Sequence, residues 1–207
     1  MDKKEKMKAL KSLLVAGIGV AALAVPLAAS ATVITFEGFP DLTVLTNQDF
    51  GNGVTFAGAT VLSAGGSLNS GNFPPHSGIN VVYNPSGPMQ LNFTTASDFF
   101  SGYFTYNQQL TVTAYDSANQ QVDQVISACA ANYVGSGCGA ANEFLEVTDP
   151  GNIAYVVITG GGGNNFTLDD ASFTGSRDPG LPEPATLVML LGGLGSLALS
   201  RRRKTVA

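Results

Sequence analysis

The sequence predicts an all-β protein built from many short antiparallel strands, arranged as a sandwich or a barrel. Short runs of alternating or apolar residues recur between residues 32 and 180, and clusters of Gly, Pro, Asn and Asp separate them at nearly regular spacing. No segment of this region shows a convincing helical period. The length of the region suits one domain with a hydrophobic core of its own.

Nine strands are predicted from these runs: Val33–Phe36, Gly53–Phe56, Ile79–Tyr83, Met89–Phe93, Phe99–Tyr106, Leu110–Tyr115, Glu143–Val147, Ile153–Thr159 and Phe166–Phe173. Turn signals between them include Gly51-Asn52-Gly53, Asn84-Pro85-Ser86-Gly87, Asn107-Gln108 and Asp149-Pro150-Gly151-Asn152. The segment Gln120–Ala131 would also suit a helical face. We interpret it as a further strand that runs into a loop.

A central hairpin is expected where Ser101–Tyr106 is followed by Leu110–Tyr115. One face of this hairpin supplies the core candidates Phe100, Phe104, Val112 and Ala114. At about 25 cal/mol per Å² of apolar surface, each buried aromatic ring contributes a few kcal/mol. The rings of Tyr103, Tyr106 and Tyr115 are expected to be partly exposed.

Residues 1–31 form a predicted secretory signal peptide. A lysine-rich stretch is followed by the apolar run Ser12–Ala29 and by Ala29-Ser30-Ala31, a small-x-small cleavage site. Signal peptidase would then release a chain that begins at Thr32. The alternative is an uncleaved N-terminal anchor helix, and both interpretations place residues 32–180 outside the cytoplasm.

The C-terminal segment, residues 181–204, has three parts. The tripeptide Pro182-Glu183-Pro184 comes first, the apolar run Ala185–Ser200 follows, and a basic cluster ends the segment with Arg201, Arg202, Arg203 and Lys204. The apolar run is a candidate transmembrane helix, and the basic cluster is expected to stay on the cytoplasmic side. A helix of this length spans about 24 Å, against a hydrocarbon core of about 30 Å, which favours a temporary anchor.

This layout resembles the PEP-CTERM sorting signal of Gram-negative bacteria. The resemblance implies that an exosortase processes the chain at Pro182, Glu183 and Pro184, after a brief stay in the inner membrane. It also implies a final location at the cell surface, in exopolysaccharide matrix or biofilm. The alternative interpretation is an ordinary tail anchor with a Pro-rich linker.

The region between the two targeting segments is strongly acidic. Residues 32–180 carry one basic residue, Arg177, and twelve acidic residues, a net charge of −11. Such a surface repels phosphate groups, so we expect no nucleic-acid partner. Anionic lipid is disfavoured for the same reason, whereas divalent cations are favoured.

The two cysteines, Cys129 and Cys138, are expected to form a disulfide. They lie close together in a stretch rich in Gly, Ala and Ser, and the chain is predicted to be exported to a compartment where disulfides persist. No CxxC motif and no cysteine–histidine cluster is present in the sequence, so redox and zinc chemistry are not expected.

The ends of the β domain carry a second resemblance. The opening Val33-Ile34-Thr35-Phe36-Glu37-Gly38 and the closing segment Phe166–Phe173 are similar to the first and last strands of jelly-roll carbohydrate-binding modules. The resemblance implies a jelly-roll-like antiparallel β-sandwich in which these two strands lie together. It also implies a structural calcium ion held by Glu37 with Asp169 or Asp170, and Asp49 is a further candidate ligand.

The apolar pattern breaks between Leu168 and Ala171, which predicts a bulge that turns one carboxylate inward. The alternative to calcium is that backbone N–H groups cap these acids or that the acids face water.

The sequence gives weak support for catalysis, and we expect a non-enzymatic protein. His76 is the only histidine, and the adjacent Ser77 is poorly placed to be a nucleophile activated by it. Glycoside hydrolysis needs a carboxylate pair, for which Asp98 with Glu143 or Glu37 with Asp170 are the candidates.

Three function classes follow. The first is an exported structural or adhesive protein of the cell surface. The second is a carbohydrate-binding module, which the absence of Trp disfavours. Its sugar platform would need tyrosines, from the set Tyr83, Tyr103, Tyr106, Tyr115 and Tyr133, since Tyr155 lies in an apolar strand. Three of them on one exposed face would make this class the first choice. The third class is a secreted hydrolase.

Overall fold

The computed structural model describes residues 31–46, 48–49, 53–160 and 165–174. This part of the chain is all-β and antiparallel, with eleven strands and no helix. The strands are β1 (Ala31–Ile34), β2 (Val44–Leu45), β3 (Gln48–Asp49), β4 (Val54–Ala57), β5 (Ala59–Ser63), β6 (Asn80–Tyr83), β7 (Met89–Tyr106), β8 (Thr111–Tyr115), β9 (Gln121–Ile126), β10 (Glu143–Thr159) and β11 (Phe166–Thr174).

The predicted signal peptide and the whole predicted C-terminal segment, with its sorting tripeptide, helix and basic cluster, lie outside the described residues. Within the described residues, no helix is long and apolar enough to cross a membrane.

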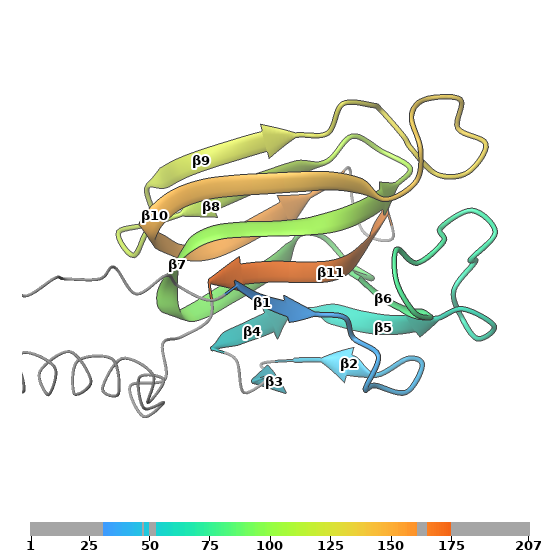
Figure 1. Ribbon diagram of the computed structural model, residues 1–207, viewed down its shortest axis with the longest axis horizontal. Helices are drawn as coiled ribbons and strands as arrows, with labels where there is room; N and C mark the ends of the chain where they lie inside the picture. The colour runs from blue at the N-terminus through green and yellow to red at the C-terminus, as the bar shows by residue number, and fades with distance from the viewer. Residues whose placement is uncertain (1–30, 47, 50–52, 161–164, 175–207) are drawn as a thin grey trace, which may run out of the picture.

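Two long strands, β7 and β10, join the two layers of the fold. Figure 1 shows them in the middle of the molecule, with β8 and β9 above and β11, β1 and β5 below in this view. The first part of β7 pairs with β4 on one side and with the end of β10 on the other. The end of β10 pairs with β8, and β8 pairs with β9. We call these strands, together with β3, which pairs with β4, sheet I. The second part of β7 pairs with β11 and with the start of β10; we call these strands, with β1, β2, β5 and β6, sheet II.

Irregular pairing between β7 and β10 marks the point where both strands pass from one sheet to the other. The register shifts between Thr148 and Ile153 and again between Ile153 and Tyr155. The predicted turn Asp149–Asn152 is therefore a bulged bend inside one strand, with Gly151 at a positive φ of 73°. This bend explains why each long strand was predicted as two separate strands.

The two sheets enclose one hydrophobic core. The ring of Phe93 in sheet I packs against Phe173 in sheet II, with ring centroids 5.3 Å apart. All four predicted core residues are fully buried, namely Phe100, Phe104, Val112 and Ala114. The prediction for Tyr106 is wrong, because its side chain points into the core and its hydroxyl reaches the carboxylate of Glu143.

The predicted hairpin between Ser101–Tyr106 and Leu110–Tyr115 is also wrong. Strand β8 pairs with β10 and β9, whereas the end of β7 pairs with β11 and β10. The short connection between β7 and β8 therefore crosses from sheet II to sheet I instead of turning within one sheet. In contrast, the predicted neighbourhood of the first and last strands is confirmed, because β1 pairs with β11 along its whole length.

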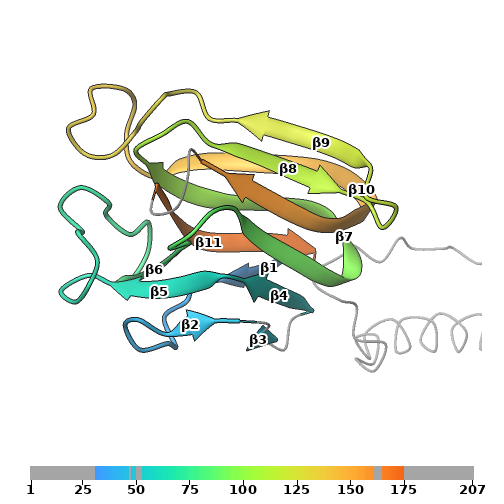
Figure 2. The ribbon, with the colours of Figure 1, turned by 180° about the vertical axis from the view of Figure 1, so that it is seen from behind.

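Two long loops, residues 64–79 and residues 127–142, lie together at one end of the sandwich (Figures 1 and 2). The backbone N–H of Val134 donates to the carbonyl oxygen of Asn72 at 2.9 Å, and the rings of Phe73 and Tyr133 stack with centroids 6.1 Å apart. The disulfide between Cys129 and Cys138 closes the second loop, with the two Cα atoms 6.0 Å apart, as predicted.

Candidate functional site

The three acids predicted as calcium ligands all bind the end of the 64–79 loop. Glu37 follows β1, and its Oε1 atom accepts hydrogen bonds from the backbone N–H groups of Ile79 at 3.0 Å and Asn80 at 2.8 Å. Asp169 and Asp170 lie in β11, which pairs with β1. The pairing of these two strands therefore brings the three carboxylates to the same loop.

The predicted bulge in β11 is present and turns the carboxylate of Asp169 toward the loop. Three residue steps of β11, from Asp169 to Ser172, lie opposite two steps of β7, and Asp170 has a positive φ of 47°. The side chain of Asp169 is 1% exposed. Its Oδ2 atom accepts the backbone N–H groups of His76 at 2.8 Å and Ser77 at 2.9 Å.

Burial raises the pKa of the Asp169 carboxyl from its ordinary value of 3.8 to about 6. Hydrogen bonds from the backbone of Ser77, Asp170 and His76 act in the opposite direction, and the nearby charge of Asp170 adds to the rise. Loss of hydration is therefore the dominant effect on this group, although its oxygens have hydrogen-bond donors.

The side chains of His76 and Ser77 meet Asp170 rather than each other. Nδ1 of His76 lies 2.7 Å from Oδ2 of Asp170, and the Ser77 hydroxyl donates to Oδ1 of Asp170 at 2.8 Å. The imidazole also stacks on Tyr103, with ring centroids 3.4 Å apart and planes 7° apart. This geometry orients His76 and Ser77 to hold the loop, and it does not pair a serine nucleophile with a histidine base.

The loop also depends on residues that the sequence analysis did not single out. Asp41 accepts the backbone N–H of Ser63 at 2.8 Å and of Ser67 at 3.0 Å, and the hydrogen bond from Ser63 is the main cause that lowers its pKa. Gly78 has a positive φ of 52°, and a Cβ atom there would collide with the Glu37 carboxylate. Only a glycine fits this position without displacing Glu37.

The donor set does not form a calcium cage in this arrangement. Calcium takes six to eight oxygen ligands, and in the described residues no three His, Cys, Asp or Glu side chains are grouped to hold a metal ion. The oxygens of Glu37 and Asp169 face N–H donors. The arrangement favours the other interpretation, in which backbone N–H groups cap these acids, and calcium binding stays a prediction. The side chain of Asp49 lies outside the described residues.

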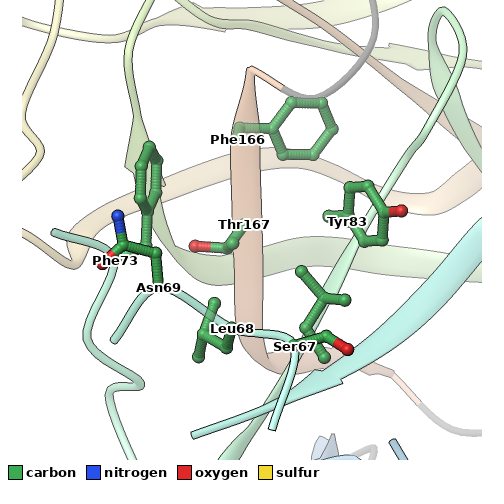
Figure 3. Close-up of a pocket in the computed structure, with 8 residues that line it drawn as sticks. Ser67, Leu68, Asn69, Phe73, Tyr83, Phe166 and Thr167 are labelled. Carbon is green, nitrogen blue, oxygen red and sulfur yellow. The ribbon is translucent and has the colours of Figure 1, made fainter. Parts of the chain in front are cut away.

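A small pocket lies beneath the 64–79 loop, with a volume of about 190 Å³. Figure 3 shows Phe73 and Tyr83 on opposite sides of it, with Thr167 between them. No lining residue is charged; they are Leu62, Ser67, Leu68, Asn69, Phe73, Tyr83, Phe166 and Thr167. The pocket is large enough for one ring-sized, mostly apolar group.

The candidate carboxylate pair Asp98 and Glu143 is too far apart for glycoside hydrolysis. Glu143 pairs with Phe104 of β7, and Asp98 lies six residues before Phe104 on the same strand. At the rise of a β-strand, six residues span about 20 Å. Glu143 binds the Tyr106 hydroxyl and the backbone N–H of Ala128, and Asp98 contacts Thr174. Hydrolytic pairs need a separation of about 5–9.5 Å.

The tyrosines do not form a three-ring platform in the described residues. Tyr106 is buried, Tyr133 stacks on Phe73, and Tyr103 stacks on His76. The rings of Tyr115 and Tyr155 stack on each other with centroids 4.9 Å apart and planes 10° apart. Sequence reasoning set Tyr155 aside because its strand is apolar, yet its side chain lies on the outer face of sheet I beside Tyr115.

Comparison with known proteins identifies the C-terminal segment. Residues 181–204 match the family model described as the PEP-CTERM protein-sorting motif. The motif marks the chain as an exported protein with a C-terminal sorting signal. No curated protein matches the chain.

Several solved structures are similar to the β domain. The K2 cleaved adhesin domain of Lys-gingipain is 17% identical, with a TM-score of 0.44 over 70% of this chain and 99% of that chain. A DUF4465 family protein from Bacteroides caccae is 14% identical, with a TM-score of 0.41 over 71% of this chain and 93% of that chain. A family 29 carbohydrate-binding module is 14% identical, with a TM-score of 0.38 over 75% of this chain and 97% of that chain. At TM-scores below 0.5, these similarities carry no argument about function.

Proposed function

We propose that this chain is a non-enzymatic protein of the cell surface or extracellular matrix, which an exosortase processes at Pro182-Glu183-Pro184. The observation that carries the proposal is the match of residues 181–204 to the PEP-CTERM protein-sorting motif. In this account the tripeptide is read by the active site of another protein. The helix 185–200 holds the chain briefly in the inner membrane of a Gram-negative bacterium, and the basic cluster 201–204 fixes its orientation.

Export explains several features of residues 32–180. Signal peptidase removes residues 1–31, and the disulfide Cys129–Cys138 then forms outside the cytoplasm. The net charge of −11 keeps the domain soluble and repels nucleic acid. We assign the domain a jelly-roll-like topology, and we assign it a structural or adhesive role in exopolysaccharide or biofilm.

The non-enzymatic assignment is supported by the contacts of the chain's only histidine. His76 is held by Asp170 and Tyr103, and the Ser77 hydroxyl donates a hydrogen bond to Asp170. These side chains stabilise a loop, which is a structural task.

Cell fractionation tests the sorting step. The full chain is expressed in a host that has an exosortase and in the same host without that enzyme. We expect the protein at the surface or in the medium of the first host, and in the inner membrane of the second host. Retention in the inner membrane of both hosts would overturn the proposal and would support a plain tail anchor.

A second candidate function, polysaccharide binding, is favoured by the stacked pair of Tyr115 and Tyr155. Both residues lie on the outer face of sheet I and are half-buried, so part of each side chain remains open to solvent. Flat aromatic surfaces of this kind support sugar rings. This function is compatible with the first, because a surface protein can adhere through a glycan.

A further inference from the structure

The outer face of sheet I is organised in rows that cross five strands. Strand pairing aligns one row in the order Thr55, Asn92, Tyr155, Tyr115 and Gln121. The pairing aligns a second row in the order Ala57, Gln90, Val157, Thr113 and Gln124. Strands lie about 4.8 Å apart, so each row extends about 19 Å across β4, β7, β10, β8 and β9.

The ten residues of these rows on β4, β7, β10, β8 and β9 include no charged side chain, although the domain has a net charge of −11. The first row meets one acidic position beyond β4, because Asp49 of β3 pairs with Thr55. Amide, hydroxyl and aromatic side chains make up almost all of both rows, and most of them are half-buried or exposed. The outer face of sheet II differs, since it holds Asp169, Asp170 and Glu146. The uncharged stretch of these rows over β7, β10, β8 and β9 suits an uncharged partner, because binding there does not depend on charge attraction or repulsion.

Three amides of this face, those of Gln90, Asn92 and Gln124, are already ordered by contacts between the rows and within the second row. Nε2 of Gln90 donates to Oδ1 of Asn92 at 2.6 Å, and Nε2 of Gln124 donates to Oγ1 of Thr113 at 3.0 Å. Each side-chain amide has two donors and two acceptor positions, so one such bond uses only part of its capacity. The remaining capacity can serve hydroxyl groups of a partner without further ordering of the side chains.

The tyrosine pair supplies an apolar surface in the middle of the first row. The Tyr155 hydroxyl lies 3.1 Å from Oδ1 of Asn119, which fixes the ring. The neighbouring Tyr115 ring is nearly parallel to it. A rigid aromatic pair beside polar amides matches a ligand unit with an apolar ring face and a polar rim, which is the chemistry of a pyranose.

We infer that the outer face of sheet I binds a neutral polysaccharide chain, with a sugar ring against Tyr115 and Tyr155 and hydroxyl groups on Gln90, Asn92 and Gln124. This inference rests on the polysaccharide-binding function proposed above and assigns it a face and a ligand class. A second copy of the chain fits this face less well. The only aliphatic side chains in the two rows are Ala57 and Val157, too little for the apolar core of a stable dimer.

Affinity electrophoresis of the full chain tests the inference, with soluble hydroxyethylcellulose and galactomannan as neutral probes and alginate as an anionic probe. We expect a neutral probe to retard the wild-type protein and alginate to leave its migration unchanged. The double variant Tyr115→Ala/Tyr155→Ala should lose at least about tenfold in affinity for that neutral probe. The matched control Tyr103→Ala/Phe144→Ala changes two aromatic rings on the outer face of sheet II and should bind as wild type does.

A second variant, Asn92→Asp, adds one charge to the face without removing a ring, and it should also weaken binding. Circular dichroism of each variant shows whether the sandwich is retained. Normal binding by the Tyr115/Tyr155 variant would overturn the assignment of the face, whether or not the Tyr103/Phe144 control loses binding. Retardation by alginate alone, or by no probe, would overturn the neutral-polysaccharide ligand. Processing at Pro182-Glu183-Pro184 is measured separately, so a failure of sorting is distinguishable from a failure of this inference.

Discussion

The backbone N–H of His76 donates to Oδ2 of Asp169 at 2.8 Å, although the two residues lie 93 positions apart in the sequence. This contact ties the 64–79 loop to the last strand of the sandwich. Since the loop also covers the small pocket beside Thr167, the buried carboxylate of Asp169 positions one wall of that pocket. Stability and the shape of this end of the molecule therefore depend on the same group.

Replacing Asp169 with Ala should lower the free energy of unfolding by about 1–3 kcal/mol. The substitution leaves the partly buried N–H groups of His76 and Ser77 without their acceptor, and each lost acceptor is costly. Urea unfolding measures the change. The matched control is Glu146→Ala on the neighbouring strand β10, whose exposed side chain should contribute less than about 0.5 kcal/mol. Equal losses in the two variants would contradict this role for Asp169.

The contribution of Asp169 to stability should fall as the pH rises. Burial raises the pKa of its carboxyl in the folded protein to about 6, above the ordinary value of 3.8, so the folded state binds this proton more tightly. The contribution is fully present below about pH 3.8 and is lost as the pH rises through about 6. The measurement is the unfolding free energy of wild type minus that of Asp169→Asn from pH 4 to pH 7. This difference should fall as the pH rises. A difference that grows with pH would show that the pKa is shifted in the opposite direction.

Removing the disulfide should destabilise the domain by roughly 2.5–3 kcal/mol, because Cys129 and Cys138 close a short loop in the unfolded chain. The double variant Cys129→Ser/Cys138→Ser and the reduced wild type should unfold at the same denaturant concentration. Reduction of the double variant should change nothing. A reduced wild type as stable as the oxidised protein would mean that the bridge does not constrain the fold.

Calcium chloride at millimolar concentration should leave the melting temperature unchanged, because N–H donors already face the oxygens of Glu37 and Asp169. Magnesium chloride and a chelator serve as controls. A rise in the melting temperature with calcium that disappears in Asp170→Asn would favour the calcium site predicted from the sequence over the capped carboxylates.

Local patterns predicted the strands better than they predicted the connections between them. Alternation identified most strands, and the break after Leu168 identified the bulge in β11. The segment Asp149–Asn152 has the composition of a turn, but pairing with β7 keeps it inside β10. Strand β5 was missed because its sequence, ATVLS, is short and weakly patterned. Such outcomes depend on long-range pairing that a local window does not contain.

The candidate site shows the same limit. The sequence singled out Glu37, Asp169 and Asp170, and strand pairing does bring them to one loop. The partners of Glu37 and Asp169, which are backbone N–H groups between His76 and Asn80, could not be predicted, because almost any residue type offers the same N–H group. The buried amide of Asn132, which binds the backbone of Phe104 and Tyr106, was missed for a related reason, since asparagine is common in exposed loops.

The intact mass of the mature protein tests the central claim most directly. The wild-type chain and a variant with Pro182, Glu183 and Pro184 all changed to Ala are expressed in a host that has an exosortase, and both are weighed by mass spectrometry. The account predicts a wild-type protein that begins at Thr32 and lacks the helix and every residue after it, and a variant that keeps them. Retention of residues 185–204 by both proteins would contradict the account.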